Sequence, residues 1–234
     1  MSSFNFSSSR REERINAYYD DSEIIEQRQY NLVLAGTLLE GLVVNYILCL
    51  TMQDYVLSLS PTAFFIGYIV SCFAGIMLSS KSNNPFISFI GYNLVVVPVG
   101  LVISISVYAF GGVNSPIVRQ TFLVTAIIVA VMVVLSMIFE DFFSSLGKVL
   151  GCSLLIILIV DGVSLLFGIG FTLITLFGSA IFSLYIGYDF WRSQQYTPTV
   201  DNAIDSAVDI YLDIANLFLK ILRLMSRSSG GRRR

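Results

Sequence analysis

Apolar runs of about 20 residues, separated by short polar turns, dominate the chain from residue 30 onward. A helix needs roughly 20 apolar residues to cross ~30 Å of hydrocarbon, and lipid offers no hydrogen-bond partners to an open backbone. Each run therefore predicts a membrane-spanning helix. The seven predicted spans are Tyr30–Met52, Pro61–Ser79, Phe86–Phe110, Ile117–Phe139, Leu146–Phe167, Ile169–Tyr188 and Ala203–Met225.

The polar segments divide the chain into a polar N-terminal tail (1–29), one transmembrane domain (30–225) and a basic C-terminal tail (226–234). Short connections between the spans favour a single bundle over separate domains. Within the first tail, Arg10–Tyr19 is expected to be helical. EDFFSS and DFWRSQQYTPTVDN are predicted loops, and Pro98 is predicted to kink the third span.

The last apolar segment carries a polar stripe that continues an aspartate ladder at positions 201, 205, 209 and 213. At about 100° per residue, five polar side chains fall within roughly 80° of one another. They are Asp205, Asp209, Asp213, Asn216 and Lys220. One ionised aspartate at a helix centre costs ~2.5–3.5 kcal/mol on insertion scales, so this face cannot be turned to lipid. We therefore predict an all-α membrane protein: a seven-helix bundle with the seventh helix at its centre.

Depth along the stripe separates the aspartates into two groups. Asp201 and Asp205 are expected at the wetted start of the helix, where the macrodipole favours acids, although Asp205 stays a secondary site candidate. Asp209 and Asp213 lie too deep for that explanation and are candidate functional residues. Lys220 is expected to extend along the helix to the far interface.

Two further acids lie inside predicted spans. For Glu40 in the first span and Asp161 in the fifth, a functional role and simple pairing within the bundle remain open alternatives. Asn216 is a further candidate because it lies on the polar stripe. The three cysteines all lie in apolar runs and are expected to be small core residues.

Composition agrees with a membrane protein and narrows its chemistry. The chain is 55% hydrophobic and 13% charged, whereas soluble domains carry about 25% charged residues. It has no histidine, which removes the usual metal ligand, general base and neutral-pH switch. Charges crowd into residues 10–28, 189–213 and the C-terminal tail and leave the middle of the chain nearly neutral, so no nucleic-acid partner is expected. The first 29 residues are polar, so no cleavable signal peptide is expected. The four arginines of the first tail predict a cytoplasmic N-terminus.

The sequence "SLYIGYDF" followed by "DIYLDIANLFLKILRLM" resembles the closing signature of the Bax inhibitor-1 family (transmembrane Bax inhibitor motif proteins). "FEDFFSSLGKVLG" is loosely similar to that family's loop before the fifth helix. The bacterial YetJ-like branch is nearest in size, which implies a bacterial plasma membrane. The resemblance implies six helices around a central seventh. It also implies a pH-sensitive calcium leak in which two aspartates of helices six and seven share a proton. Those positions match Asp189 and Asp213 here.

The second span departs from that family's pattern. Bacterial members often carry an embedded acid and an arginine in or at the end of helix two, whereas this span has no charge. Glu40 is the comparable acid, and the basic partner of the aspartate pair is left open.

Elementary electrostatics supports a proton-sharing pair independently of the resemblance. Two carboxylates in contact at low dielectric cannot both stay ionised cheaply, so they titrate as a unit. Carboxylate oxygens also suit Ca²⁺, so Asp189 and Asp213 are its expected ligands, with protons as competitors. The expected partners are membrane lipid, Ca²⁺ and protons; Ca²⁺ is the transported ion and no cofactor is expected.

The alternative function is a non-conducting regulator that binds a membrane protease or a stress or cell-death partner, with the N-terminal tail as its recognition element. An enzyme is not expected. The chain has no histidine and no GxSxG motif, and the surroundings of Asp161 do not resemble those of an intramembrane aspartyl protease.

Overall fold

The computed structural model describes residues 23–167 and 172–230, so the predicted tail helix Arg10–Tyr19 lies outside the described residues. The described part of the chain is organised as helices in the order α2 (Gln27–Thr51), α3 (Gln53–Ser58), α4 (Pro61–Lys81), α5 (Pro85–Ala109), α6 (Pro116–Ile138), α7 (Glu140–Ser145), α8 (Gly147–Phe167), α9 (Thr172–Ser193) and α10 (Val200–Gly230).

The prediction of an all-α membrane protein is confirmed. In the described residues, five helices are long and apolar enough to cross a membrane: α2, α4, α5, α6 and α9. The two other long helices are α8, with 21 residues, and α10, with 31 residues. The stripe of charges on α10 lowers its mean hydropathy, so length and apolar content alone do not identify that helix as a span.

The boundaries differ from the prediction between the spans and at α10, which runs from Val200 to Gly230 and so exceeds the predicted Ala203–Met225 at both ends. Short helices α3 and α7 occupy segments that the pattern assigned to turns, including EDFFSS. The predicted loop after Tyr188 is also wrong at its start, because α9 continues to Ser193. No helix breaker occurs between Asp189 and Ser193, and the chain leaves the helix before Pro198, which restricts the residue preceding it.

Proline and glycine mark the ends of several helices. Pro61, Pro85 and Pro116 start α4, α5 and α6. Proline lacks a backbone N–H, but the first residue of a helix does not donate a hydrogen bond within the helix, so nothing is lost there. Gly111 and Gly112 follow α5 with φ values of 98° and 79°, a conformation that side chains disfavour. The helix α5 itself runs without interruption through Pro98.

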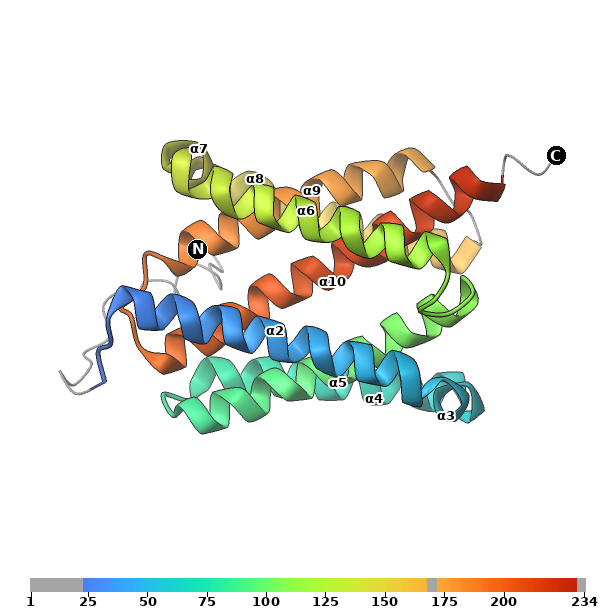
Figure 1. The fold of residues 1–234 in the computed structure, drawn as a ribbon, viewed down its shortest axis with the longest axis horizontal. Helices are drawn as coiled ribbons and strands as arrows, with labels where there is room; N and C mark the ends of the chain where they lie inside the picture. The colour runs from blue at the N-terminus through green and yellow to red at the C-terminus, as the bar shows by residue number, and fades with distance from the viewer. Residues whose placement is uncertain (1–22, 168–171, 231–234) are drawn as a thin grey trace, which may run out of the picture.

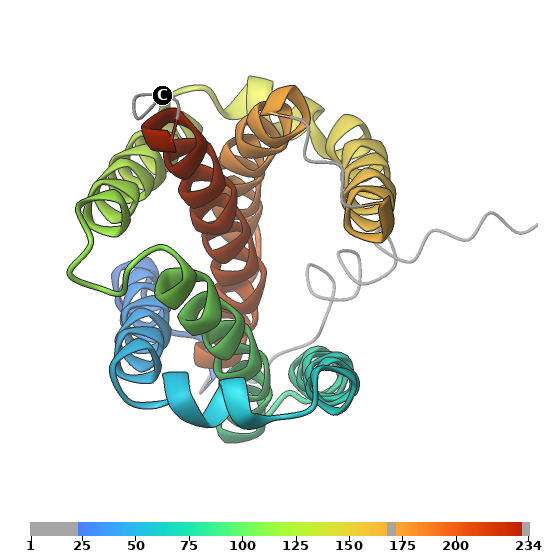
Figure 2. The same ribbon diagram turned by 90° about the vertical axis from the view of Figure 1, so that its right-hand side faces the viewer.

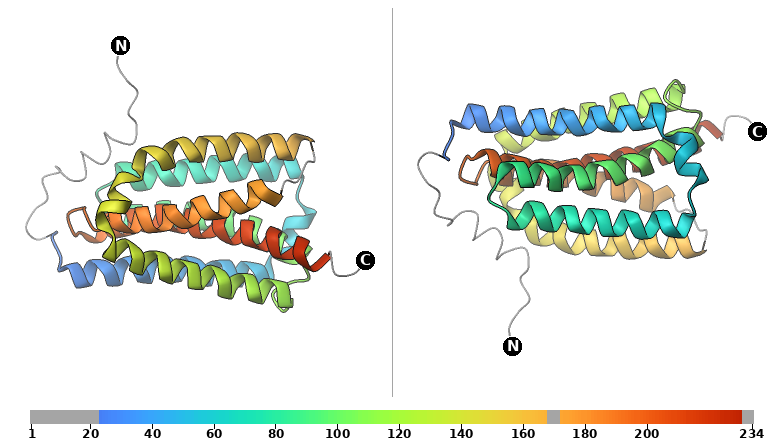
Figure 3. Two further views of the ribbon diagram at one scale, coloured as in Figure 1. Left: turned by 90° about the horizontal axis from the view of Figure 1, so that it is seen from above. Right: turned by 90° about the horizontal axis from the view of Figure 1, so that it is seen from below.

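Helix α10 lies among the other helices. It packs against α9, α5, α2, α6 and α4, and the end-on view shows it passing obliquely between the α2–α5 side and the α6–α9 side of the bundle (Figure 2). The start of α2 and the end of α10 lie at opposite ends of the molecule (Figures 1 and 3). Helices α4 and α8 lie on the outside and expose many apolar side chains, as lipid-facing helices do.

Two glycines bring α4 and α5 into direct backbone contact. A Cβ on Gly91 would lie 2.7 Å from the carbonyl oxygen of Gly75 and 2.7 Å from the backbone nitrogen of Ser79. Close approach through small residues is a common way for membrane helices to associate, because lipid provides no hydrophobic drive between them. The contact fixes α4 against α5, and these helices supply the serines that meet α10.

We expect Gly91→Ala to destabilise the bundle by about 1–3 kcal/mol, because backbone atoms cannot move aside as a flexible side chain can. Thermal unfolding of the detergent-solubilised protein measures the effect. Gly67→Ala on the same helix pair is the matched control, since nothing lies within 4 Å of its ideal Cβ. Equal melting temperatures for the two variants would contradict the packing argument.

Candidate functional site

The end of α9 and the start of α10 form the junction that carries most of the candidate residues. Because α9 continues past Tyr188, Asp189 and Arg192 lie one turn apart on the same helix. Tyr30 of α2 forms hydrogen bonds with both helices of this junction. Its hydroxyl donates to the backbone oxygen of Ser193 at 2.9 Å and lies 3.1 Å from the Ser206 hydroxyl. One tyrosine of α2 thus contacts both helices that meet here.

Asp189 and Asp213 lie in direct contact at this junction. Each residue is 7% exposed, and their carboxyl groups face each other between α9 and α10, within reach of interaction. An ionised carboxylate only accepts hydrogen bonds, so a hydrogen bond between the two groups needs a proton on one of them. The Oδ2 atom of Asp213 is buried and has no hydrogen-bond partner among the described residues.

Arg192 is the cation of the cluster. Its Nη2 lies 2.6 Å from Oδ2 of Asp209 and 3.2 Å from Oδ1 of Asp189, and its guanidinium lies 5.6 Å from the centre of the Tyr188 ring. The guanidinium therefore joins α9 to α10 through a second contact, beside the Asp189–Asp213 pair. With one proton on that pair, three acids and one arginine leave a net charge of −1.

The structure corrects the expected depths of the aspartates. Asp201 and Asp205 are buried inside the protein, which contradicts the prediction that they are solvated. The Ser88 hydroxyl of α5 donates to Asp201 at 2.6 Å, and the Ser79 hydroxyl of α4 donates to Asp205. Asp209, predicted to lie deep, has a side chain that is 43% exposed. The start of α10 is covered because α4 and α5 pack over it.

Lys220 was expected to reach the far interface, and this expectation is wrong. It is 4% exposed, and its Nζ donates to Oδ2 of Asp161 on α8 at 2.7 Å. Its partner Asp161 thus lies in the other half of the bundle from Asp189 and Asp213. The reason is steric: Gly178 on α9 leaves room for the lysine stem to lie inside the bundle.

The remaining candidates are not part of the aspartate cluster. Glu40 on α2 faces the side of α10 that carries Tyr211, and its Oε2 is buried without a hydrogen-bond partner among the described residues. Asn216 donates its side-chain amide to the backbone oxygen of Leu212 on its own helix, at 2.8 Å. Cys49 is buried as expected, whereas Cys152 is exposed on α8.

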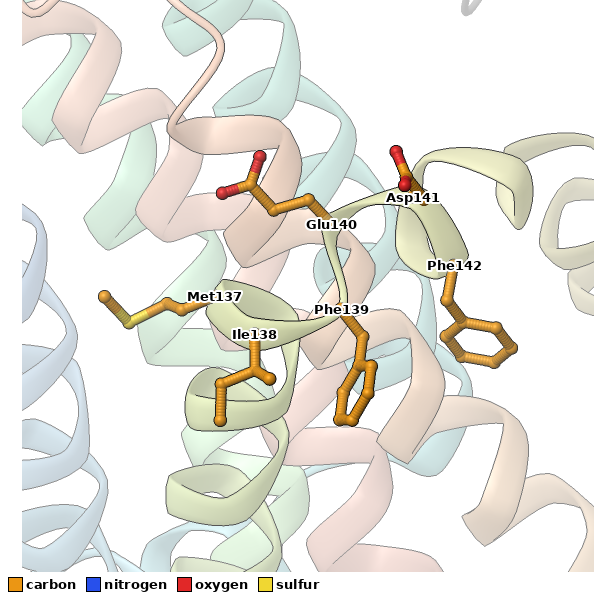
Figure 4. A pocket seen from close by; sticks show the side chains of 6 residues that line it. All are labelled: Met137, Ile138, Phe139, Glu140, Asp141 and Phe142. Atoms are coloured by element: carbon orange, nitrogen blue, oxygen red, sulfur yellow. The ribbon is translucent and has the colours of Figure 1, made fainter.

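The short helix α7 packs against the same end of α9. Phe143 is buried, and a Cβ on Gly187 would lie 2.3 Å from its ring, so Gly187 is required for this contact. A hollow nearby is lined by the end of α6 and the start of α7, where Glu140 and Asp141 point away from the apolar side chains (Figure 4). The hollow contains none of the acids of the α9–α10 junction.

The acids offer few ligands for a bound metal ion. Among the described residues, no group of three or more Asp, Glu, Cys or His side chains is disposed to hold one. Two aspartates in contact provide four oxygens, whereas Ca²⁺ usually takes six to eight. A calcium ion at Asp189 and Asp213 would therefore keep part of its water, as a passing ion does.

Sequence reasoning missed the roles of Arg192 and Lys220. The spacing of Asp189 and Arg192 was a usable signal, because residues three apart on a helix lie on the same face. It went unused because the predicted helix ended at Tyr188. For Lys220 and Asp161 the sequence held no comparable signal, since the two residues are 59 positions apart.

Comparisons with known proteins place this geometry in context. The family model described as "Inhibitor of apoptosis-promoting Bax1" matches residues 23–230. An uncharacterised protein of Helicobacter pylori (strain J99 / ATCC 700824) is 29% identical over 225 residues, which cover 90% of this chain and 92% of that protein. A "BI1-like protein" of Arabidopsis thaliana is 34% identical over 85 residues, which cover 36% of this chain and 33% of that protein.

Proposed function

The chain belongs to the Bax inhibitor-1 family, and from that premise we propose that it lets calcium and other cations leak across a membrane under the control of a shared proton. The observation that carries the proposal is the burial of Asp189 and Asp213 against each other, with Arg192 beside them. The path follows the polar face of α10, and Ca²⁺ and protons compete for the carboxylate oxygens along it.

The proposed architecture is a bundle of seven spans with α10 at the centre. Support comes from the packing of α10 against five other helices and from the 21-residue length of α8. We further propose that the membrane is a bacterial plasma membrane and that the N-terminal tail is cytoplasmic, since the tail carries four arginines and orientation follows the count of Lys and Arg near the spans. The end of α10 then lies on the opposite side, which agrees with the positions of the two helix ends (Figure 1).

Protonation controls the contact between α9 and α10 in this mechanism. With one proton, Asp189 and Asp213 hold the two helices together by a hydrogen bond. When that proton leaves, two negative charges face each other at low dielectric, and Arg192 offsets only part of their repulsion because it is shared with Asp209. A cation that enters the site takes the place of the lost proton.

The test is calcium flux into liposomes that contain the reconstituted protein, measured from pH 5 to pH 8. We expect flux above that of empty vesicles and a change across this range, because the pair titrates as a unit. The Gly67→Ala protein is a control for purification and reconstitution, since its substitution lies away from the site. No calcium flux above empty vesicles at any pH would rule out the leak and favour a non-conducting regulator.

A further inference from the structure

Lys220 places a fixed positive charge on the polar face of α10, in the half of the helix away from the aspartate cluster. It lies 11 residues after Asp209, which is about 16 Å along the helix. Both residues belong to the stripe that the proposed path follows. A cation moving along this face from the acidic end would therefore meet an ammonium group.

The packing holds that ammonium in place. A Cβ on Gly178 of α9 would lie 2.7 Å from Cε of Lys220 and 2.8 Å from its Nζ, so only glycine leaves room for the stem there. The Nζ lies 5.7 Å from the centre of the Phe182 ring and 2.7 Å from Oδ2 of Asp161. The ion pair with Asp161 and the contact with the Phe182 ring hold the lysine inside the bundle, in the room that Gly178 leaves.

Asp161 neutralises the ammonium from one side only. It belongs to α8 on the outside of the bundle, and its side chain is 37% exposed, whereas that of Lys220 is 5% exposed. The negative charge thus lies on the outer side of the pair, and the positive charge lies on α10. Asn216, the stripe residue one turn before Lys220, is uncharged and bonded to its own helix.

We propose that Lys220 is a specificity-determining residue that limits cation passage along α10 and that Asp161 moderates this barrier. The proposal rests on the proposed cation leak and adds a second point of control to it. Fixed positive charges exclude cations from other membrane pores by the same electrostatic repulsion. The repulsion acts twice as strongly on Ca²⁺ as on K⁺, because the interaction energy scales with the charge of the ion.

The proposal predicts opposite effects for the two partners of the ion pair. Lys220→Met removes the positive charge and should raise calcium flux roughly three- to tenfold, and raise potassium flux by less. Asp161→Asn leaves the ammonium without its counter-charge and should lower calcium flux. A pair that only anchors α8 would give the same direction of change in both variants, with equal effects on the two ions.

The experiment measures calcium and potassium flux in liposomes at one fixed pH. Lys220→Arg keeps the charge and should retain wild-type flux. Lys81→Met is the matched control, since Lys81 is exposed at the end of α4. Thermal unfolding of each protein in detergent identifies variants that do not fold. If Lys220→Met does not fold, Asp161→Asn alone decides, because unchanged or higher calcium flux there contradicts the barrier.

The outcomes separate this proposal from the leak itself. If the wild type conducts and the Lys220→Met protein shows equal or lower calcium flux, the barrier is overturned and the leak still stands. A silent wild type with a conducting Lys220→Met supports the barrier. Silence of both proteins overturns the barrier together with the leak.

Discussion

Asp213→Asn is expected to abolish the pH dependence of cation flux, leaving rates at pH 5 and pH 8 within about twofold of each other. The amide of asparagine has the shape of a protonated carboxyl and donates a hydrogen bond to Asp189 at any pH. As pH rises, the wild-type pair loses its shared proton and gains a second negative charge. The variant pair cannot gain that charge, so the contact between α9 and α10 persists.

Other titratable groups surround the pair and could sustain a pH response. Arg192 and Tyr188 come from α9 with Asp189, Asp209 comes from α10, and Tyr185 faces both aspartates. Asp209→Asn is the matched control, because it removes an acid of the same helix that is paired with Arg192 and lies outside the Asp189–Asp213 contact. The measurement is calcium flux in liposomes from pH 5 to pH 8 for the wild type and both variants. A pH response in Asp213→Asn as large as that of wild type would exclude the pair as the sensor.

Arg192→Gln is expected to destabilise the folded protein by about 1–3 kcal/mol at pH 8 and by less at pH 5. Asp189 and Asp209 then lose the one cation that the described residues bring within ion-pair distance of them. The expected loss is at the low end for a buried pair, because the Asp209 side chain is 43% exposed and solvent screens that contact. At pH 5 protons replace part of the missing positive charge, so the deficit shrinks as pH falls.

Thermal unfolding in detergent at pH 5 and pH 8 measures this difference. Arg119→Gln is the control, since Arg119 is exposed near the start of α6. Arg192→Lys should recover only part of the loss, because a compact ammonium lacks the planar guanidinium that also lies over the Tyr188 ring. A deficit that is the same at both pH values would show that Arg192 acts through packing and carries no charge-balancing role.

The sequence singled out the acids of the candidate site but did not show which cation contacts them. The polar stripe on the last helix and its avoidance of lipid follow from a local period of 3.6 residues and from hydropathy. Asp189 and Asp213 were identified through the resemblance of residues in α9 and α10 to the family's closing signature. The cation beside them was not identified. The predicted helix ended at Tyr188, five residues before the true end of α9 at Ser193, so Arg192 was assigned to a loop.

The chain alone therefore determined an all-helical membrane protein with an acidic face on its last helix, since helix length, hydropathy and side-chain period are properties of neighbouring residues. Only the tertiary structure decided which charges meet. The burial of Asp201 and Asp205 under α5 and α4, and the pairing of Lys220 with Asp161, depend on how the helices are rotated and how closely they approach. Contacts such as that of Gly178 with the Lys220 stem set those approaches, and they join residues far apart in the sequence.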